Sequence, residues 1–210
     1  MKIQERALEV AKLLKKEHPN PKTELNYENE MELSIAVTMS AQTTDIKVNQ
    51  VNETLFKKYK TWEDFANADL EQMIKDVYGV NFHRGKADRI IKMAQMVISD
   101  FGGKLPRTME ELIKLPGVAR KSANVIMQEL WGIAEGVVVD THVTRVSNRL
   151  GLTQQKDAVK IEKELMVLFP KNSWRNISGA MVLHGRYVCK ARKPNCSECV
   201  LNKICPSAFN

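Results

Sequence analysis

One segment of this sequence combines a tight turn with two cations at the start of a helix. It reads Leu115-Pro116-Gly117-Val118-Ala119-Arg120-Lys121. Proline and glycine favour the turn, and the helix after it would direct backbone N–H groups and the positive end of its dipole outward, which suits a phosphate. A lysine in the first turn opposes that dipole, so Lys121 is either a phosphate contact or an amine that must lose its charge easily. On these residues alone, an ordinary helix–helix turn and a surface lysine that binds phosphate remain open.

A second candidate is Asp140, which follows the apolar run Val137-Val138-Val139. It stands where the N-cap of a helix is expected, and aspartate is among the residues that cap helices best. A carboxylate at a helix start also stays ionised, so it could stabilise positive charge that develops on a substrate or help to activate an attacking group. The capping role and the chemical role are compatible.

All four cysteines lie close together, at Cys189, Cys196, Cys199 and Cys205. In the cytosol, four thiolates within such a short segment would indicate a metal centre, because disulfides are disfavoured in that compartment. Structural zinc and a [4Fe-4S] cluster both accept four thiolates, and the spacing does not choose between them. The loop between the first two cysteines is basic, and a metal would fix it as a rigid finger suited to phosphate contacts.

The elements that must position these groups are nearly all helices. Apolar residues recur with helical spacing, and capping residues and glycines mark the ends. The expected helices cover about 1–17, 31–40, 44–59, a short stretch from 61, 69–77, 86–101, 108–114, 118–131, 141–150, 158–169 and 174–188. Val80 to Gly85 is expected to be a loop that exposes Phe82. The run Val137 to Val139 is expected to be buried extended chain, since no partner strand is found. The sequence therefore predicts an all-α protein.

Composition and charge narrow the class of protein. Hydrophobic residues make up 43% of the chain and charged residues 27%, which is typical of a globular protein. No apolar run is long enough to cross a membrane, and the first ten residues lack the apolar core of a signal peptide, so we expect a cytoplasmic protein. An excess of 32 Lys and Arg over 25 Asp and Glu gives a net charge of +7, which favours an anionic partner.

Four motifs together resemble one known family. They are LPGVARKSANV at 115–125, VDTHV at 139–143, HGRYVC at 184–189 and the C-x6-C-x2-C-x5-C pattern of the cysteines. These residues resemble endonuclease III, a family of helix-hairpin-helix DNA glycosylase/AP lyases that removes oxidised pyrimidines, and the likeness covers about residues 24–205. The resemblance implies a [4Fe-4S] cluster rather than zinc. It also implies two helical domains with a DNA-binding groove between them: a six-helix barrel with the hairpin at 23–135, and an iron–sulfur cluster domain made of 1–22 and 136–210.

The resemblance also assigns chemistry to Lys121 and Asp140. The neutral amine of Lys121 would attack C1′ of the sugar and displace the base, and the resulting Schiff base would permit β-elimination of the 3′ phosphate. We expect the helix start and partial burial to lower the pKa of this lysine. Asp140 would act as the electrostatic and acid–base partner. The segment between these two residues is one residue longer than in the family's usual pattern, and we expect the loop at 133–136 to absorb it.

An enzyme that acts on a base inside duplex DNA must take that base out of the stack. Gln42 resembles the family's glutamine that fills the vacated place, and Val80 or Phe82 would be the partner wedge. The Gly79-to-Lys86 segment that carries this wedge is two residues longer than usual. The other expected DNA contacts are the hairpin residues Leu115, Gly117, Val118, Ala119 and Arg120, together with Arg186 and Lys193.

The expected partner is double-stranded DNA that holds damaged bases or abasic sites, bound by a monomer on the nucleoid of a prokaryotic cell. Within the same superfamily, a pyrimidine-dimer glycosylase or a mismatch-specific glycosylase is the alternative. Lys121 disfavours the mismatch-specific relatives, which resemble this chain but carry other residue types at that position. A non-catalytic module that binds damaged DNA, and a zinc protein with no role on DNA, are alternatives from other classes.

Overall fold

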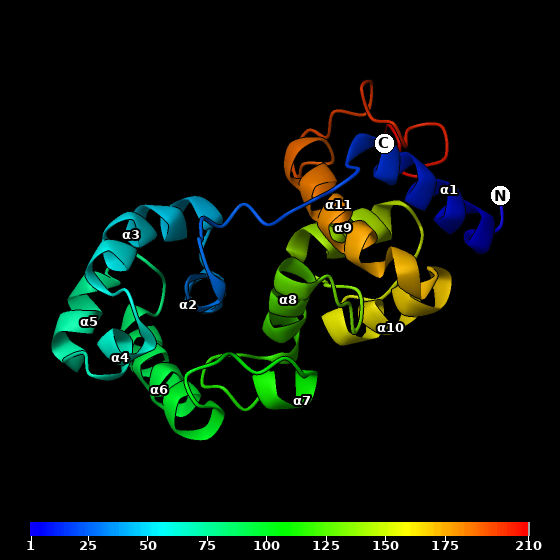
Figure 1. Cartoon of the computed structure of the whole chain (residues 1–210). Coiled ribbons are helices and arrows are strands. Elements are labelled where there is room, and N and C mark those ends of the chain that lie inside the picture. The colour runs from blue at the N-terminus through cyan, green and yellow to red at the C-terminus, as the bar shows by residue number, and fades with distance from the viewer. Residues whose placement is uncertain (210) are drawn as a thin grey trace. The chain divides into compact units, whose positions relative to one another are not determined.

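The computed structural model describes residues 1–209, and the chain divides into two compact units (Figure 1). One unit is Glu24–Trp131, and the other combines Met1–Thr23 with Gly132–Asn210. Eleven α-helices and one 3-10 helix lie within residues 1–209, where the only strand-like feature is an isolated bridge between Tyr78 and Val80. The predicted all-α class is confirmed.

The unit Glu24–Trp131 is built around one helix that is buried on all sides. This helix, α2, is Glu30–Ser40, and every residue from Met31 to Met39 is buried. It contacts α3, α6 and α8, so it shows none of the apolar–polar alternation of a surface helix. The other helices of the unit are α3 (Asp45–Lys58), α4 (Trp62–Ala66), α5 (Leu70–Asp76), α6 (His83–Phe101), α7 (Met109–Leu112) and α8 (Arg120–Trp131).

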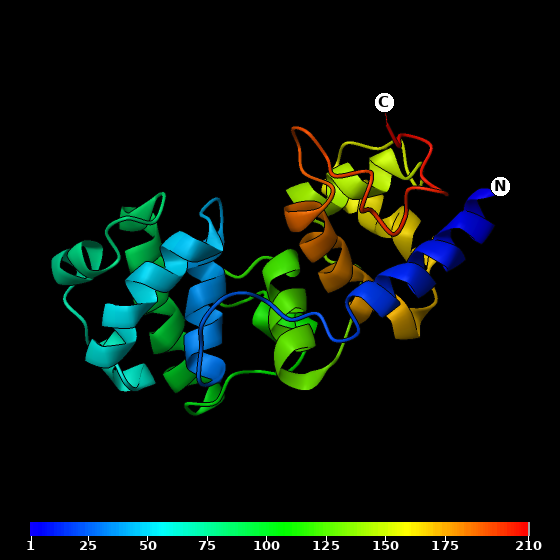
Figure 2. The same ribbon diagram turned by 90° about the horizontal axis from the view of Figure 1, so that it is seen from above.

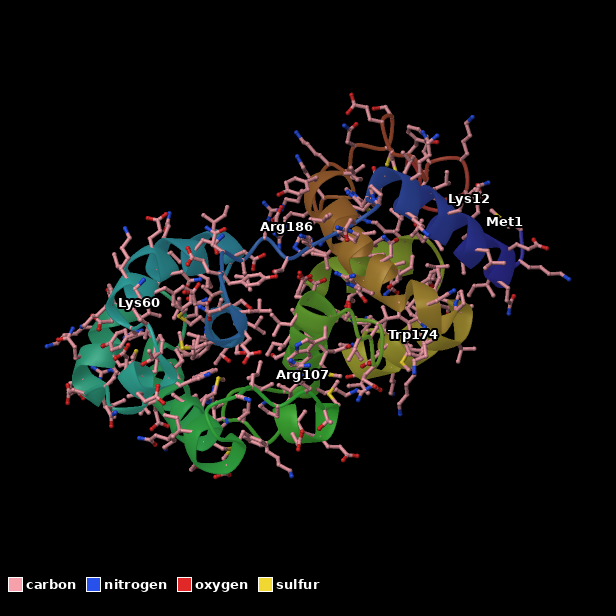
Figure 3. All side chains as sticks on the ribbon, viewed as in Figure 1. Met1, Lys12, Lys60, Arg107, Trp174 and Arg186 are labelled. Carbon is pink, nitrogen blue, oxygen red and sulfur yellow. The ribbon has the colours of Figure 1, made fainter. Side chains whose placement is uncertain are left out.

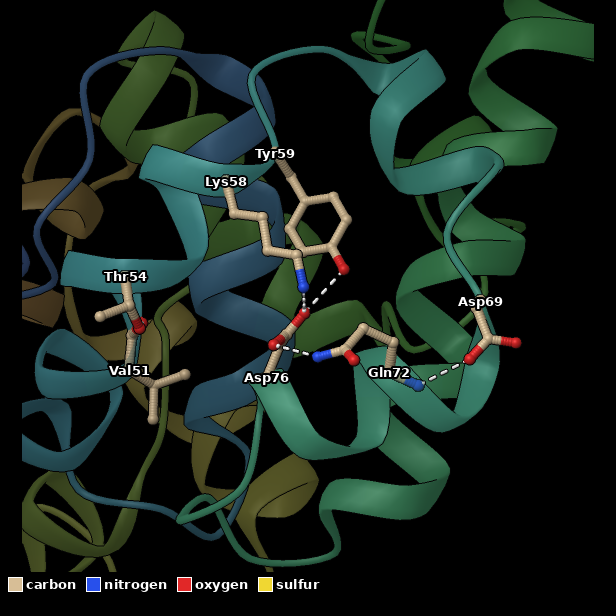
Figure 4. A network of polar contacts seen from close by, with 7 residues as sticks. All are labelled: Val51, Thr54, Lys58, Tyr59, Asp69, Gln72 and Asp76. Atoms are coloured by element: carbon tan, nitrogen blue, oxygen red, sulfur yellow. Dashed lines mark hydrogen bonds and ion pairs between the residues drawn. The ribbon is translucent and has the colours of Figure 1, made fainter.

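A polar network joins α3 and α5 at the surface of this unit (Figure 4). The carboxylate of Asp76 accepts hydrogen bonds from Lys58 Nζ at 2.5 Å, Tyr59 Oη at 2.7 Å and Gln72 Nε2 at 2.9 Å. Burial alone would raise the pKa of Asp76, but these three hydrogen bonds and the charge of Lys58 lower it. The ionised carboxylate therefore fastens the two helices together.

The second unit contains α1 (Ile3–Glu17), α9 (Thr141–Arg149), α10 (Ala158–Leu168), the 3-10 helix Lys171–Ser173 and α11 (Trp174–Tyr187). The amphipathic helix α1, blue in Figure 2, buries Ala7, Val10 and Leu14 and packs on α11 and α10. Val137, Val138 and Val139 are buried, as predicted, and lie outside any helix; Val137 and Val139 belong to this unit's core. The two ends of the sequence thus share one hydrophobic core.

One expected boundary is wrong. The loop predicted from Val80 to Gly85 ends earlier, because α6 begins at His83. Phe82 turns the chain into the helix with a left-handed backbone (φ +58°). Gly85 lies inside the first turns of the helix, where a Cβ would meet no other atom within 4 Å. Glycine at that position indicated a loop but is tolerated in this helix. Separately, no helix among residues 1–209 is long and apolar enough to cross a membrane.

Candidate active site and metal centre

The hairpin between α7 and α8 is anchored by its two apolar residues. The Leu115 N–H donates to Leu112 O at 3.1 Å, and the Val118 N–H donates to Leu115 O at 3.0 Å. Both Leu115 and Val118 are buried, whereas Gly117, Ala119 and Arg120 are exposed. Gly117 has φ +89°, and a Cβ there would lie 2.8 Å from Thr38 Cγ2, so only glycine fits both the turn and its close packing. The buried residues Leu115 and Val118 therefore fix the turn in place, while Gly117, Ala119 and Arg120 are exposed to solvent.

Lys121 lies in the first turn of α8 and is exposed. The expectation of partial burial is therefore wrong for this side chain. The core-facing side of α8 carries Ala123, Ile126 and Met127, and Lys121 is not part of it. Backbone N–H groups in the first turn of a helix have no acceptor within the helix, so an anion can bind beside Lys121.

Asp140 is the N-cap of α9, as predicted. Its Oδ1 accepts a hydrogen bond from the Val143 N–H at 2.8 Å, and its carbonyl accepts one from the Thr144 N–H at 2.9 Å. Asp140 is half-buried, and Val139 and Val143, which lie near it in the sequence, are buried. The cap fixes the carboxylate in one orientation. A group that stabilises charge during a reaction must be held in place in this way.

Gln42 and Phe82 both lie at exposed turns with left-handed backbone, at φ +56° and φ +58°. Such conformations are uncommon for residues other than glycine and persist only where the surrounding contacts impose them. The Phe82 side chain is 67% exposed, whereas that of Val80 is 2% exposed and belongs to the core. Val80 could not enter DNA without leaving that core, so Phe82 is the better placed of the two expected wedges.

The four cysteines line one pocket beside α9 and α11, and none of the four is joined to another cysteine by a disulfide. Cationic side chains approach two of the sulfurs. Arg149 Nη1 donates to Cys189 Sγ at 3.3 Å, and His184 Nε2 lies 3.5 Å from Cys199 Sγ. The other ring nitrogen of His184, Nδ1, lies 2.8 Å from Glu17 Oε2, which fixes the ring.

The electrostatics of this pocket fit a bound metal cluster. Burial raises the pKa of the Cys205 thiol, and so does the negative charge of the other three cysteines. Four thiolates repel one another in this way unless a cationic centre binds them. Burial alone would lower the pKa of His184, but hydrogen bonds to Cys199 and Glu17 raise it to about 9. A protonated His184 and Arg149 thus offer N–H donors of the kind that surround metal-bound sulfur.

The basic finger, residues 190–195, is held by the same arginine. Arg149 donates to Lys190 O at 2.7 Å and to Ala191 O at 3.0 Å. Lys193 is exposed at the finger and has a left-handed backbone (φ +50°). Arg186, labelled in Figure 3, is half-buried in the last turn of α11, shortly before the first cysteine.

Three supporting residues were not found from the sequence. Arg149 lies on a helix far along the chain from the finger that it holds, Glu17 lies in the N-terminal helix, and Lys86 of α6 donates from Nζ to Met39 O of α2 at 2.6 Å. For Lys86, the only local observation was its place at the start of a predicted helix, and that place does not indicate any particular role. Their partners are close only after folding, so no spacing in the sequence could reveal them.

Comparison with known proteins agrees with this geometry. Residues 35–171 match the model of the HhH-GPD superfamily base excision DNA repair protein, and residues 189–205 match the iron–sulfur binding domain of endonuclease III. The first match covers the hairpin, Lys121 and Asp140, and the second begins and ends on cysteines. The fold and the site therefore define a base excision DNA repair protein of the HhH-GPD superfamily.

Similar whole proteins narrow this class further. The chain is 44% identical to endonuclease III of Synechocystis sp. over 97% of the chain and 93% of the relative, and 45% identical to that of Bacillus subtilis over 89% and 85%. A solved non-covalent endonuclease III–DNA complex superimposes with a TM-score of 0.92 at 39% identity over 99% of this chain and 97% of that one. A trapped endonuclease III–DNA covalent intermediate has the same TM-score and identity, over 99% and 98% of the two chains. The chain belongs to the endonuclease III family.

Membership confirms what the resemblance implied about activity and cofactor. The protein is a bifunctional DNA glycosylase and AP lyase of base excision repair that acts on oxidised pyrimidines, and it binds DNA. The chain binds a [4Fe-4S] cluster, and Cys189, Cys196, Cys199 and Cys205, which line one pocket, are the residues that would hold it. The zinc alternative is not the cofactor of this family.

Proposed function

We propose that Lys121 is the nucleophile of this enzyme and that Asp140 is its electrostatic and acid–base partner. The observation that carries the proposal is the exposed amine of Lys121 in the first turn of α8, directly after a hairpin that only glycine at position 117 can form. A damaged strand held by its phosphate at the hairpin would lie within reach of that amine.

The reaction then follows from the amine. Neutral Lys121 Nζ attacks C1′ of the damaged nucleotide, the N-glycosidic bond breaks, and the base leaves with the bonding electrons and takes up a proton. The sugar ring opens to a protonated Schiff base with Lys121. Loss of a C2′ proton converts the protonated imine into an enamine. The enamine electrons then form the C2′–C3′ double bond and restore the imine as the C3′–O bond breaks and the 3′ phosphate leaves with the bonding pair. Water finally hydrolyses the imine and regenerates the lysine.

Asp140 would act on the positive charge that this sequence of steps creates. Its carboxylate is held by the Val143 N–H and is half-buried, so its interaction with a cationic sugar or imine is screened less than that of an exposed group. Substituting Asp140→Asn keeps an oxygen for the cap but removes the charge. We expect single-turnover excision to fall by about a hundredfold or more while the unfolding temperature changes little.

The finer features of DNA recognition belong to the same proposal. Gln42 would fill the place of the extruded base, and Phe82 would be the wedge on the other loop. The hairpin residues Leu115, Gly117, Val118, Ala119 and Arg120 would hold one phosphate, while Arg186 and Lys193 would contact the backbone further along. The enzyme would act as a monomer, on damaged bases and abasic sites of nucleoid DNA in the cytoplasm.

Borohydride trapping tests the nucleophile directly. Reduction of the Schiff base should crosslink the wild-type chain to a duplex that holds an abasic site, and Lys121→Ala should give no crosslink above background. Lys114→Ala is the matched control, because Lys114 is also exposed next to the hairpin. Wild-type crosslinking by Lys121→Ala would remove this lysine from the mechanism.

The lesion range can be measured with the same protein. We expect excision from duplexes that contain thymine glycol or dihydrouracil, and none from an intact duplex. Faster excision of a pyrimidine dimer than of either oxidised pyrimidine would favour the dimer glycosylase alternative, which uses the same lysine chemistry.

A further inference from the structure

The ammonium of Lys86 is buried inside the unit Glu24–Trp131, at the C-terminal end of α2. The residue is 2% exposed although it lies near the start of α6. Its Nζ donates to Met39 O at 2.6 Å, to Ala41 O at 2.7 Å and to Thr43 Oγ1 at 3.0 Å. Three oxygens thus satisfy the three N–H donors of a lysine.

This position has a clear electrostatic reason. The last turn of α2 carries no basic residue, yet the C-terminal carbonyls of a helix attract cations. Lys86 supplies that cation from another helix. Burial lowers the pKa of Lys86 to about 8, with a contribution from the charge of Arg89, so the ammonium form still predominates at pH 7.

Lys86 contacts the turn on both sides of Gln42. Ala41 and Thr43 flank the exposed glutamine, and Gln42 itself has a left-handed backbone (φ +56°). Asn81 holds the same turn, since its side chain donates to Gln42 O at 2.5 Å and its backbone N–H donates to Thr43 Oγ1 at 3.0 Å. The Thr43 hydroxyl therefore accepts from both Lys86 and Asn81, and Asn81 directly precedes Phe82.

We infer that Lys86 is a positioning residue that locks the Gln42 turn to the Phe82 turn, so that both residues enter the DNA stack as one rigid unit. The inference rests on the proposed roles of Gln42 and Phe82. Without the ammonium, three oxygens at the end of α2 lose their common donor, and the strained backbone of Gln42 loses the contacts that impose it. Gln42 would then be poorly ordered and would fill the place of the extruded base less effectively.

Hydrogen exchange of the free protein tests the positioning without any DNA. We expect Lys86→Met to speed amide exchange of the segment 40–44 by about tenfold or more relative to wild type, because the loss of a charged hydrogen bond loosens the turn. Lys92→Met is the matched control, since Lys92 lies on the same helix and its side chain is 59% exposed beside Asp88. Unchanged exchange in Lys86→Met would overturn the inference.

A double-mutant cycle tests whether the effect on catalysis passes through Gln42. We expect Lys86→Met to slow single-turnover excision of thymine glycol by about tenfold in the wild-type background, but by less than about twofold when Gln42→Ala is already present. Losses that multiply would show that Lys86 acts elsewhere, and would overturn the inference. If Gln42→Ala alone leaves excision at the wild-type rate, the proposed role of Gln42 fails, whereas the exchange measurement decides separately whether Lys86 holds the turn.

A second variant covers the case in which Lys86→Met does not fold. Thr43→Val removes the hydroxyl that accepts from both Lys86 and Asn81 but keeps the size of the side chain. It should reproduce the faster exchange of segment 40–44 and the coupling to Gln42→Ala, and wild-type behaviour in both measurements would contradict the proposed lock.

Discussion

Arg149 and Cys189 share a hydrogen bond in which Nη1 lies 3.3 Å from Sγ. The same guanidinium donates to the carbonyls of Lys190 and Ala191, so one side chain contacts a cluster ligand and the start of the basic finger. Arginine suits this role because its planar fork of N–H groups serves several acceptors at once. Support of the metal and presentation of the finger are therefore linked through Arg149.

The substitution Arg149→Met should weaken both the retention of iron and the binding of DNA by the basic finger. We expect loss of iron to a chelator to become about tenfold to a hundredfold faster, as is usual when an outer hydrogen bond to a metal ligand is removed. Affinity for undamaged DNA should fall as well. Arg192→Met, at an exposed residue of the finger, should lower DNA affinity and leave iron retention unchanged. Iron loss in Arg149→Met at the wild-type rate would contradict the role of this hydrogen bond.

Phe82 and Val80 should respond in opposite ways to truncation. Phe82→Ala should reduce base excision while stability changes by less than about 0.5 kcal/mol, because the ring is 67% exposed. Val80→Ala should instead lower the free energy of unfolding by about 1 to 3 kcal/mol, since Val80 is 2% exposed. Urea unfolding and single-turnover excision measure the two effects, and a stable Val80→Ala protein that loses excision would make Val80 the wedge.

Gly117→Ala should destabilise the hairpin by more than backbone strain alone. Gly102→Ala is the matched control, because Gly102 also has a positive φ (+60°) but open space at its Cβ position. We expect the control to cost about 1 kcal/mol and Gly117→Ala to cost about 1 to 2 kcal/mol more, through the contact with Thr38. Equal costs in thermal unfolding would show that the packing against Thr38 relaxes freely. Non-specific DNA binding should weaken only in Gly117→Ala.

The Asp76 network should make part of the stability depend on pH. The pKa of Asp76 is below its ordinary value of 3.8 in the folded protein, so the unfolded chain takes up the proton first as the pH falls. The stabilisation is therefore complete above about pH 5 and is lost as the pH drops through the folded pKa. We expect Asp76→Asn to cost about 1 to 2 kcal/mol at pH 7, and the difference from wild type to shrink below pH 4. Urea unfolding at several pH values measures this, and a constant difference would contradict it.

The sequence by itself determined the all-α class, the approximate bounds of most helices, the iron–sulfur cofactor and the family. These features follow from local patterns: the helical spacing of apolar residues, the capping residues and the four clustered cysteines. Such patterns depend only on residues that are close together in the sequence. The positions of Lys121 and Asp140 at helix starts were predicted in the same way, from a turn and from a capping residue, while their catalytic roles rest on the family resemblance and stay a prediction. The left-handed backbone of Phe82 was not predicted, since no residue type at that position requires it, and the predicted start of α6 was wrong because Gly85 indicated a loop.

Only the tertiary structure decided how these groups are supported. Lys121 is exposed although burial was expected, Val80 is buried although it was a candidate wedge, and Lys86 has its ammonium inside the protein. Each outcome depends on which face of a helix or turn meets residues from distant parts of the chain. Arg149 lies 41 residues from Lys190 of the finger, and Lys86 lies 47 residues from Met39 at the end of α2. Hydrogen bonds and burial between such segments exist only in the folded chain, so the pattern of neighbouring residues cannot specify them.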